Sequence, residues 1–166
     1  MSLPPYPIDS PIWWGFVILL LIAIATDVRR YEIPNWLVLV LLAGGLALLA
    51  IELPNAVIAH VLTGLGGLVV GFILYAVTGM GAGDAKLLAA SLLWAGPGAL
   101  TPMLFWLAIA SALLVILLLA GRYLAPKVAG ERKIPEPLQK DAAVPFALAI
   151  SPAVILASST FPPAFW

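Results

Sequence analysis

The sequence predicts an all-α, polytopic membrane protein with about six transmembrane helices. Hydrophobic residues make up 63% of its 166 residues and charged residues only 10%, whereas charged residues form about a quarter of a typical soluble domain. Apolar runs long enough to cross a bilayer recur along the chain. The basic residues fall in a few segments between these runs, as expected of loops on one side of a membrane.

Six apolar runs are candidate membrane-spanning helices, judged against the roughly 20 residues that cross a bilayer. They cover residues 11–28, 34–51, 55–77, 84–97, 99–120 and 144–161. The fourth run is short and ends at Gly96-Pro97-Gly98, so we expect it either to cross a thin region of membrane or to be tilted and partly sheltered. The runs lack the alternating polarity of barrel strands. The length fits one helical unit, so residues 1–166 are expected to form a single transmembrane domain.

The distribution of basic residues predicts the orientation. With the N-terminus outside, the inner segments are 29–33, 78–83 with the start of the fourth run, and 121–143; they contain all eight Lys and Arg residues. This partition favours a multi-pass protein with both ends outside. Segment 121–143 contains three prolines and mixed charges. We expect an exposed connector, with room for a short interfacial helix, that anchors the inner side, and substrate docking is the alternative.

Composition excludes several classes of function. The formal net charge is zero, so the basic footprint of a nucleic-acid-binding protein is absent. There is no cysteine, which excludes disulfides, thiolate nucleophiles and zinc–cysteine sites. The single histidine, His60, lies inside an apolar run, where a packed polar side chain is favoured over a proton relay. We expect neither a metal nor an organic cofactor.

Two acidic residues stand at the ends of apolar runs that the predicted topology places on the cytoplasmic side. Asp27 closes the first run in "AIATDVRRYEIPNW", and Asp84 opens the fourth in "TGMGAGDAKLLAA". If a helical bundle brings them together, burial and the neighbouring charge raise a carboxyl pKa, and the pair shares a proton. One carboxylate can then activate water while the protonated partner polarises a carbonyl, which is the chemistry of aspartic proteases.

Simpler interpretations of both residues stay open. Asp84 would serve as the N-cap in an ordinary turn, and Asp27 would belong to a solvated cluster with Arg29, Arg30 and Glu32. Acidic residues at the edges of membrane spans are nevertheless functional candidates by default. A non-enzymatic, proton-coupled transporter or assembly subunit is the alternative class of function. Transporters often show two related halves with sites near the midplane, and neither feature is found in this sequence.

Glycines surround Asp84 and recur in the third run. The glycines at positions 79, 81 and 83 permit close approach of another chain, as an extended peptide substrate would need. Gly67 and Gly71 form a small-xxx-small pattern that lets neighbouring helices approach closely.

Three segments carry a family resemblance. "GAGDAKL" resembles the Gly-Xaa-Gly-Asp-Xaa-Lys-Leu motif of the type IV prepilin peptidases, which are intramembrane aspartic peptidases. "DVRRYEIPN" resembles the other signature of that family, and "VPFALAI" at 144–150 is similar to the start of the family's last helix. The three segments occur in the family's order and span most of the chain.

The resemblance implies a peptidase that removes the short basic leader from prepilin-like precursors (type IV pilin, Flp pilin or archaellin-like) at the cytoplasmic face of the plasma membrane. Asp27 and Asp84 carry over as the catalytic pair. Gly81 and Gly83 carry over as the motif glycines, and we expect both, together with Lys86, to contact the substrate. The roles implied for Ile33, Pro34 and Asn35 are structural. The bilayer and the precursor are the expected partners, and nucleic acid is not.

One departure from the family pattern bears on activity. Many bacterial members have a cysteine-bearing cytosolic segment and methylate the new N-terminus of the pilin. This chain has no cysteine, so it resembles the short, peptidase-only branch of the family. Methyltransferase activity is therefore not expected.

Overall fold

The computed structural model describes residues 11–52, 55–78, 80–129, 139 and 144–160. Within these ranges the chain forms helices and no strands. The elements are α1 (Pro11–Arg30), α2 (Asn35–Glu52), α3 (Val57–Thr78), α4 (Ala82–Ala95), the 3-10 turn η1 (Pro97–Ala99), α5 (Leu100–Ala129) and α6 (Ala147–Thr160). Each α-helix coincides with one of the six predicted apolar runs. The all-α prediction is confirmed.

Three of the helical segments are long and apolar enough to cross a membrane: Pro11–Arg30, Val57–Val77 and Pro97–Ala125. The apolar parts of α2 and α6, Asn35–Ile51 and Ala147–Ala157, are shorter. Large hydrophobic side chains lie exposed along α3 and α5, among them Leu62, Phe72, Phe105 and Leu117. An apolar surface of this extent suits lipid and not water, so the chain is a membrane protein.

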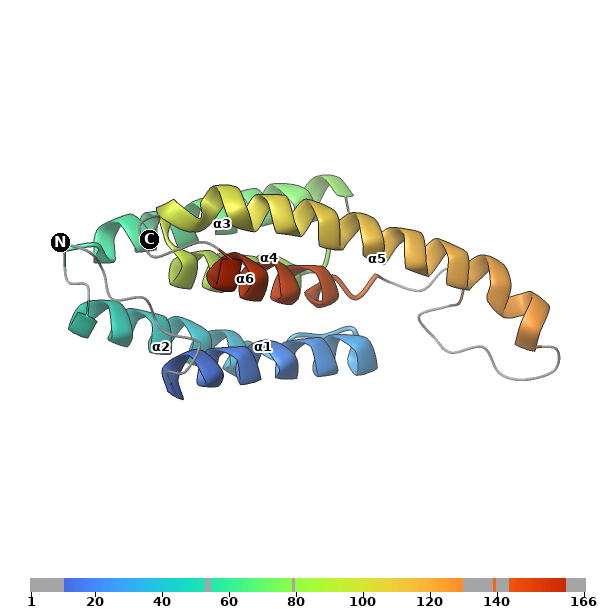
Figure 1. Cartoon of the computed structure of the whole chain (residues 1–166), viewed down its shortest axis with the longest axis horizontal. Coiled ribbons are helices and arrows are strands. Elements are labelled where there is room, and N and C mark those ends of the chain that lie inside the picture. Colours follow the sequence, from blue (N-terminus) through green and yellow to red (C-terminus); the bar gives the residue numbers. More distant parts are fainter. Residues whose placement is uncertain (1–10, 53–54, 79, 130–138, 140–143, 161–166) are drawn as a thin grey trace.

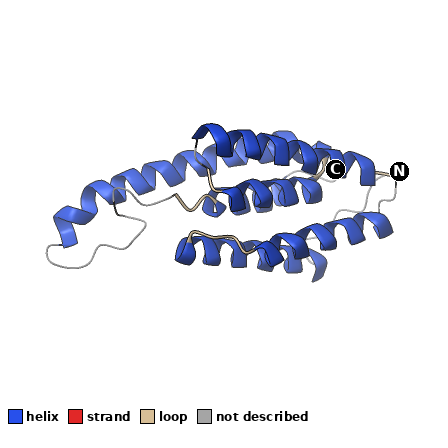
Figure 2. Cartoon of the chain, turned by 180° about the vertical axis from the view of Figure 1, so that it is seen from behind, coloured by secondary structure: helices blue, strands red, loops and turns tan. Residues whose placement is uncertain are grey.

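Helix α4 occupies the middle of the molecule. Figures 1 and 2 show α4 and α6 between a layer formed by α3 and α5 and a layer formed by α1 and α2. Most of the α4 residues are buried. Trp94 anchors α4, because its Nε1 donates a hydrogen bond to the carbonyl oxygen of Leu41 on α2 at 2.7 Å. Its ring also stacks on Phe16 of α1. The expected shelter of the fourth apolar run is therefore found.

The glycines of α3 form its contact with α4. A Cβ atom at Gly71 would lie 2.9 Å from the Cα of Ala85, and one at Gly67 would collide with Leu92. By contrast, nothing lies within 4 Å of the position that a Cβ would take at Gly66. The small-xxx-small pattern therefore serves a contact inside the protomer.

His60 is packed at the far end of α4. It is buried, and its Nδ1 lies 2.9 Å from the carbonyl oxygen of Leu93, one of the terminal carbonyls that lack a partner within the helix. Gly96 ends α4 with a φ of 71°, and a Cβ there would collide with the His60 ring. His60 is thus the packed polar side chain that its apolar setting favours.

The segment predicted as a connector begins later than expected. Residues 121–129 continue α5, which has 30 residues and is therefore about 45 Å long. That length exceeds the roughly 30 Å of a hydrocarbon core, so the charged last turns do not need to lie among acyl chains. Figure 1 shows α5 extending past the ends of the other helices. The prediction of a connector from residue 121 was wrong for 121–129; residues 130–138 and 140–143 lie outside the described residues.

Candidate functional site

Asp27 and Asp84 lie at the same end of the helical bundle, where α1 ends and α4 begins (Figure 1). Their side chains are only 5% and 6% exposed. They are close enough for the charge of Asp27 to act on the carboxyl group of Asp84. The structure thus brings together the two acids that the sequence singles out. It also shows that the solvated-cluster interpretation of Asp27 is wrong, because this side chain is buried.

Asp84 sits in the first turn of α4 but is not its N-cap residue. Gly81 occupies the N-cap position, and its backbone N–H donates a hydrogen bond to the Asp84 carboxylate. The other carboxylate oxygen, Oδ1, is buried and has no hydrogen-bond partner among the described residues. A buried ionised oxygen without a partner is costly, so this environment favours the protonated form of Asp84.

Electrostatics act in the same direction. Burial, followed by the negative charge of Asp27, raises the pKa of Asp84 to about 7, and the hydrogen bond from Gly81 opposes this rise. Asp84 lies outside the three segments that are long and apolar enough to cross a membrane. At neutral pH the Asp84 carboxyl group is therefore able to hold a proton and to release it, as a general acid requires.

Asp27 is held by the start of α6. The main-chain N–H of Ala147, the first residue of α6, donates a hydrogen bond to Oδ2 of Asp27 at 3.0 Å. A second link joins the same helices, because Oγ of Ser151 donates to the carbonyl oxygen of Leu20 at 3.4 Å. The motif segment at 144–150, which contains Ala147, therefore contacts the motif segment that begins at Asp27. Sequence reasoning missed Ala147, since its function lies in a main-chain group that leaves no side-chain signal.

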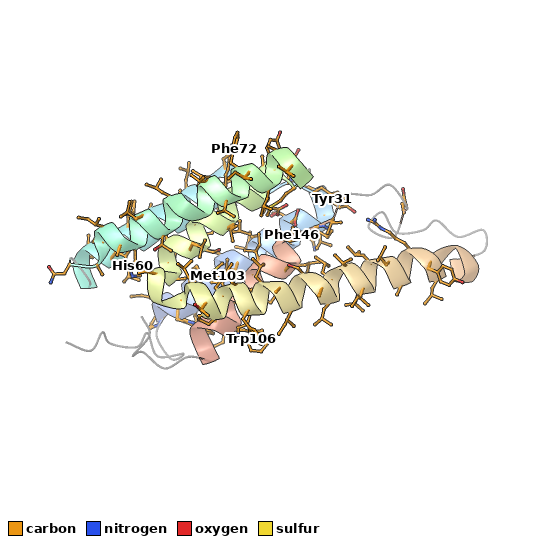
Figure 3. The ribbon with its side chains drawn as sticks, turned by 90° about the horizontal axis from the view of Figure 1, so that it is seen from above. Tyr31, His60, Phe72, Met103, Trp106 and Phe146 are labelled. Carbon is orange, nitrogen blue, oxygen red and sulfur yellow. The ribbon has the colours of Figure 1, made fainter. Side chains whose placement is uncertain are left out.

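The last turn of α1 ends at Tyr31 with an uncommon backbone conformation. Tyr31 has a φ of 52°, which non-glycine residues rarely adopt, and its N–H donates to the carbonyl oxygen of Asp27 at 2.8 Å. Figure 3 shows Tyr31, just after α1, in the same part of the molecule as Phe146, just before α6, and away from His60. The turn at Tyr31 therefore closes the helical turn that contains Asp27 and leads the chain toward α2.

The residues after Asp27 and those around Asp84 are in direct contact. A Cβ at Gly83 would lie 3.1 Å from the Cβ of Ile33, and Nζ of Lys86 donates a hydrogen bond to Oδ1 of Asn35 at 2.9 Å. Helix α2 begins at Asn35, directly after Pro34. The structure thus assigns a packing contact to Ile33 and a polar contact to Asn35. Together these two contacts hold the connector between α1 and α2 against the start of α4.

Other side chains of the protein occupy the space that a Cβ atom would take at the glycines beside Asp84. At Gly81 the place of a Cβ lies 2.8 Å from Oδ2 of Asp84, and at Gly83 it is crowded by Ile33. A side chain at either position would therefore press on Asp84 or on Ile33. Contact of Gly81, Gly83 or Lys86 with a substrate stays a prediction.

The chemistry available at this end of the bundle is that of two neighbouring carboxyl groups. Among the described residues, no group of three or more His, Cys, Asp or Glu side chains is arranged to hold a metal ion. One buried pair, with a proton held near neutral pH, is sufficient for acid–base activation of water.

A model of the type IV leader peptidase family matches residues 14–119 of the chain. The chain belongs to the type IV leader peptidase family. The family identifies it as a peptidase, which agrees with the resemblance of its motifs and disfavours the transporter alternative. No curated protein and no solved structure matches the chain.

The matched part of this leader peptidase contains both aspartates and extends from α1 into α5. Helix α6 lies beyond the match, yet its first residue hydrogen-bonds Asp27. The candidate site of the peptidase therefore includes a main-chain group outside the part that the family model covers.

Proposed function

We propose that this leader peptidase is an intramembrane aspartic endopeptidase in which Asp27 and Asp84 form the catalytic pair. The observation that carries the proposal is the burial of both carboxyl groups at one end of the bundle, where the charge of one acts on the other. The family supplies the reaction class, hydrolysis of a leader peptide bond. The carboxyl pair supplies the groups that such a reaction needs without a metal or cofactor.

In this mechanism Asp84 carries the proton and Asp27 is the base. Asp27 takes a proton from a water molecule, and the water oxygen forms a bond to the carbonyl carbon of the scissile peptide. Asp84 gives its proton to the carbonyl oxygen as the tetrahedral intermediate forms. The C–N bond then breaks, Asp27 passes its proton to the leaving amine, and Asp84 regains a proton as the carboxyl product forms.

The proposed substrates are prepilin-like precursors with a short basic leader, cleaved at the cytoplasmic face of the plasma membrane. Arg29 and Arg30 end α1 two and three residues after Asp27, and Lys86 follows Asp84 in α4. Basic residues at one end of a membrane protein favour the cytoplasmic side for that end. Because the chain contains no cysteine, we propose cleavage without methylation of the new N-terminus.

Co-expression with a prepilin tests the proposed function. The wild type should shorten the precursor, whereas Asp27→Asn and Asp84→Asn should not, because an amide neither accepts nor donates the transferred proton at neutral pH. Glu32→Gln is the matched control, since Glu32 is an exposed acid just after α1 and its loss should leave cleavage intact. Cleavage at the wild-type rate by both Asp variants would show that the pair is not catalytic.

A further inference from the structure

An apolar groove of about 540 Å³ lies between α2 and α3, with α4 as its floor. Helices α2 and α3 both pack on α4, but their contact with each other is small. Leu39 and Leu42 line the groove from α2, and Leu65 and Leu68 line it from α3. Leu39, Leu65 and Leu68 are exposed, so the groove is open to the surroundings of the protein, which in a membrane are lipid.

The groove is polar at one end only. Asn35 and Lys86 are the polar side chains of its lining, and Nζ of Lys86 donates a hydrogen bond to Oδ1 of Asn35 at 2.9 Å. Leu46 and Leu93 line the other end, where a Cβ at Gly45 would collide with Leu93. A ligand that matches this lining has a polar head and an elongated apolar body.

The polar end carries a positive charge that no acid neutralises. Among the residues that the structure describes, the ammonium group of Lys86 is paired with the neutral amide of Asn35 and with no carboxylate. An ammonium group has three donors, so two are left for a ligand. Both side chains are exposed and can be reached from outside. The head group that this end favours is therefore an anion.

The dimensions of the groove match one leaflet of a bilayer. Its α2 wall extends from residue 35 to residue 46, which corresponds to about 16 Å, close to half of a hydrocarbon core of roughly 30 Å. Trp36, next to Asn35, is 53% exposed, and exposed tryptophans are typical of the membrane–water interface. The cationic end of the groove therefore lies at the level of the lipid head groups.

We propose that the groove between α2 and α3 is a binding site for one anionic phospholipid. Its phosphate group contacts Lys86 and Asn35, and one acyl chain lies along the leucines of α2 and α3. Because the bound lipid contacts two helices that touch each other little, it stabilises the folded bundle. The inference goes beyond the proposed function and does not depend on it, since it concerns the lipid and not the precursor.

Lipid titrations of the purified protein in a non-ionic detergent, followed by native mass spectrometry, test the role of the charge. The wild type should bind phosphatidylglycerol about fivefold more tightly than phosphatidylcholine with the same acyl chains, because one basic side chain favours the anionic lipid by that factor. Lys86→Gln should bind the two lipids equally. The matched control is Arg29→Gln, which removes an exposed basic residue at the same end of the bundle but outside the groove and should keep the wild-type preference.

Two results of these titrations would overturn the proposal. One is equal affinity of the wild type for the two lipids, which would show that the groove does not select an anionic head group. The other is an unchanged preference in Lys86→Gln, which would place the anionic lipid elsewhere on the protein.

Photolabelling tests the position of the acyl chain. Phosphatidylglycerol with a diazirine in one acyl chain should label residues 38–46 and 61–68, and an excess of unlabelled phosphatidylglycerol should suppress this labelling. Leu65→Trp fills the groove and should reduce the labelling. Leu62→Trp should not, because Leu62 is exposed on the same helix without lining the groove. Suppressible labelling that is confined to other helices would contradict the assignment.

Glycerol phosphate distinguishes a phospholipid site from a site for a free phosphate group. The thermal midpoint of the wild type in detergent should rise when phosphatidylglycerol is added, because a ligand of the native state stabilises it, and should not change with glycerol phosphate. An equal rise with both would show that the acyl chain is not recognised and that the phospholipid assignment is wrong. No precursor is present in these measurements, so their outcome is independent of the cleavage assays that test the proposed function.

Discussion

The main-chain N–H of Ala147 donates a hydrogen bond to Oδ2 of Asp27 at 3.0 Å, although 120 positions separate the two residues in the chain. This bond joins the end of α1 to the start of α6 at the candidate active site. The two acids therefore differ in their hydrogen bonding. Asp27 accepts this main-chain bond, whereas Oδ1 of Asp84 is buried without a hydrogen-bond partner among the described residues. The difference supports Asp27 as the base and Asp84 as the proton carrier in the proposed mechanism.

Replacing Ala147 with proline should impair cleavage. Proline removes the N–H but is well accepted at the first residue of a helix, so α6 should still form. A hydrogen bond to a charged group contributes about 1.5–3 kcal/mol, and a loss of this size in the transition state lowers kcat/KM by about tenfold to a hundredfold. The control is Ala147→Gly, which keeps the N–H. Equal activities of the proline and glycine variants in a prepilin cleavage assay would show that the N–H does not contribute.

Gly83→Ala should weaken the contact between the two motif segments. The added Cβ would lie 3.1 Å from the Cβ of buried Ile33, so the connector must move. Overpacking of this kind costs about 1–3 kcal/mol, which should appear as a lower thermal midpoint in detergent and a lower cleavage rate. The control is Gly66→Ala, where the new Cβ meets nothing within 4 Å. There the free energy of unfolding should rise by about 0.5–1 kcal/mol, because alanine favours helix.

Gly96→Ala should destabilise the end of α4 that is remote from the carboxyl pair. Gly96 has a φ of 71°, and a Cβ there would collide with the His60 ring. A backbone with φ of 71° and ψ of 179° is essentially restricted to glycine and costs another residue about 1–3 kcal/mol, and the collision adds about 1–3 kcal/mol. Thermal unfolding in detergent should show the loss, while Gly15→Ala, with nothing within 4 Å of its Cβ position, should be neutral or stabilising. A Gly96→Ala protein as stable as the wild type would contradict this packing.

The protonation of Asp84 should make stability depend on pH. Its pKa is raised from 3.8 to about 7, first by burial and then by the charge of Asp27. The native state therefore binds the proton more tightly than the unfolded state. This contribution to stability is fully present below pH 3.8 and is lost as the pH rises through about 7, with the sign required by proton linkage. The thermal midpoint of the wild type should fall as the pH rises across this range, and that of Asp84→Asn should fall less. Equal slopes of the thermal midpoint against pH would show that Asp84 is not the group that binds this proton.

Much of the architecture follows from local patterns in the chain. In a membrane, the backbone N–H and C=O groups of a long apolar run must form hydrogen bonds within the run, so such a run is helical. Each predicted run coincides with a helix. The main error concerns the end of α5, where charges and prolines predicted a connector from residue 121. The helix continues to Ala129, because a charged helical end beyond the bilayer core meets no penalty from lipid.

The candidate site was accessible from sequence only in part. Asp27 and Asp84 stand out because acids are rare beside membrane spans, and the motif residues around them identify the family. The supporting contacts carry no comparable signal. These contacts join segments that are far apart in the chain. They are the packing of Ile33 against Gly83, the hydrogen bond from Lys86 to Asn35 and the hydrogen bond from the N–H of Ala147 to Asp27.

The sequence by itself determined the helical membrane class and the two acids at helix ends, because hydropathy and the rarity of charge are properties of the chain alone. Only the tertiary structure decided that these acids are buried together, that α6 holds one of them, and that the glycines beside the other accommodate the protein's own side chains. These features depend on how helix ends meet across the bundle. That arrangement is set by packing around α4, where small residues on α3 and the anchored ring of Trp94 fix the distances between helices.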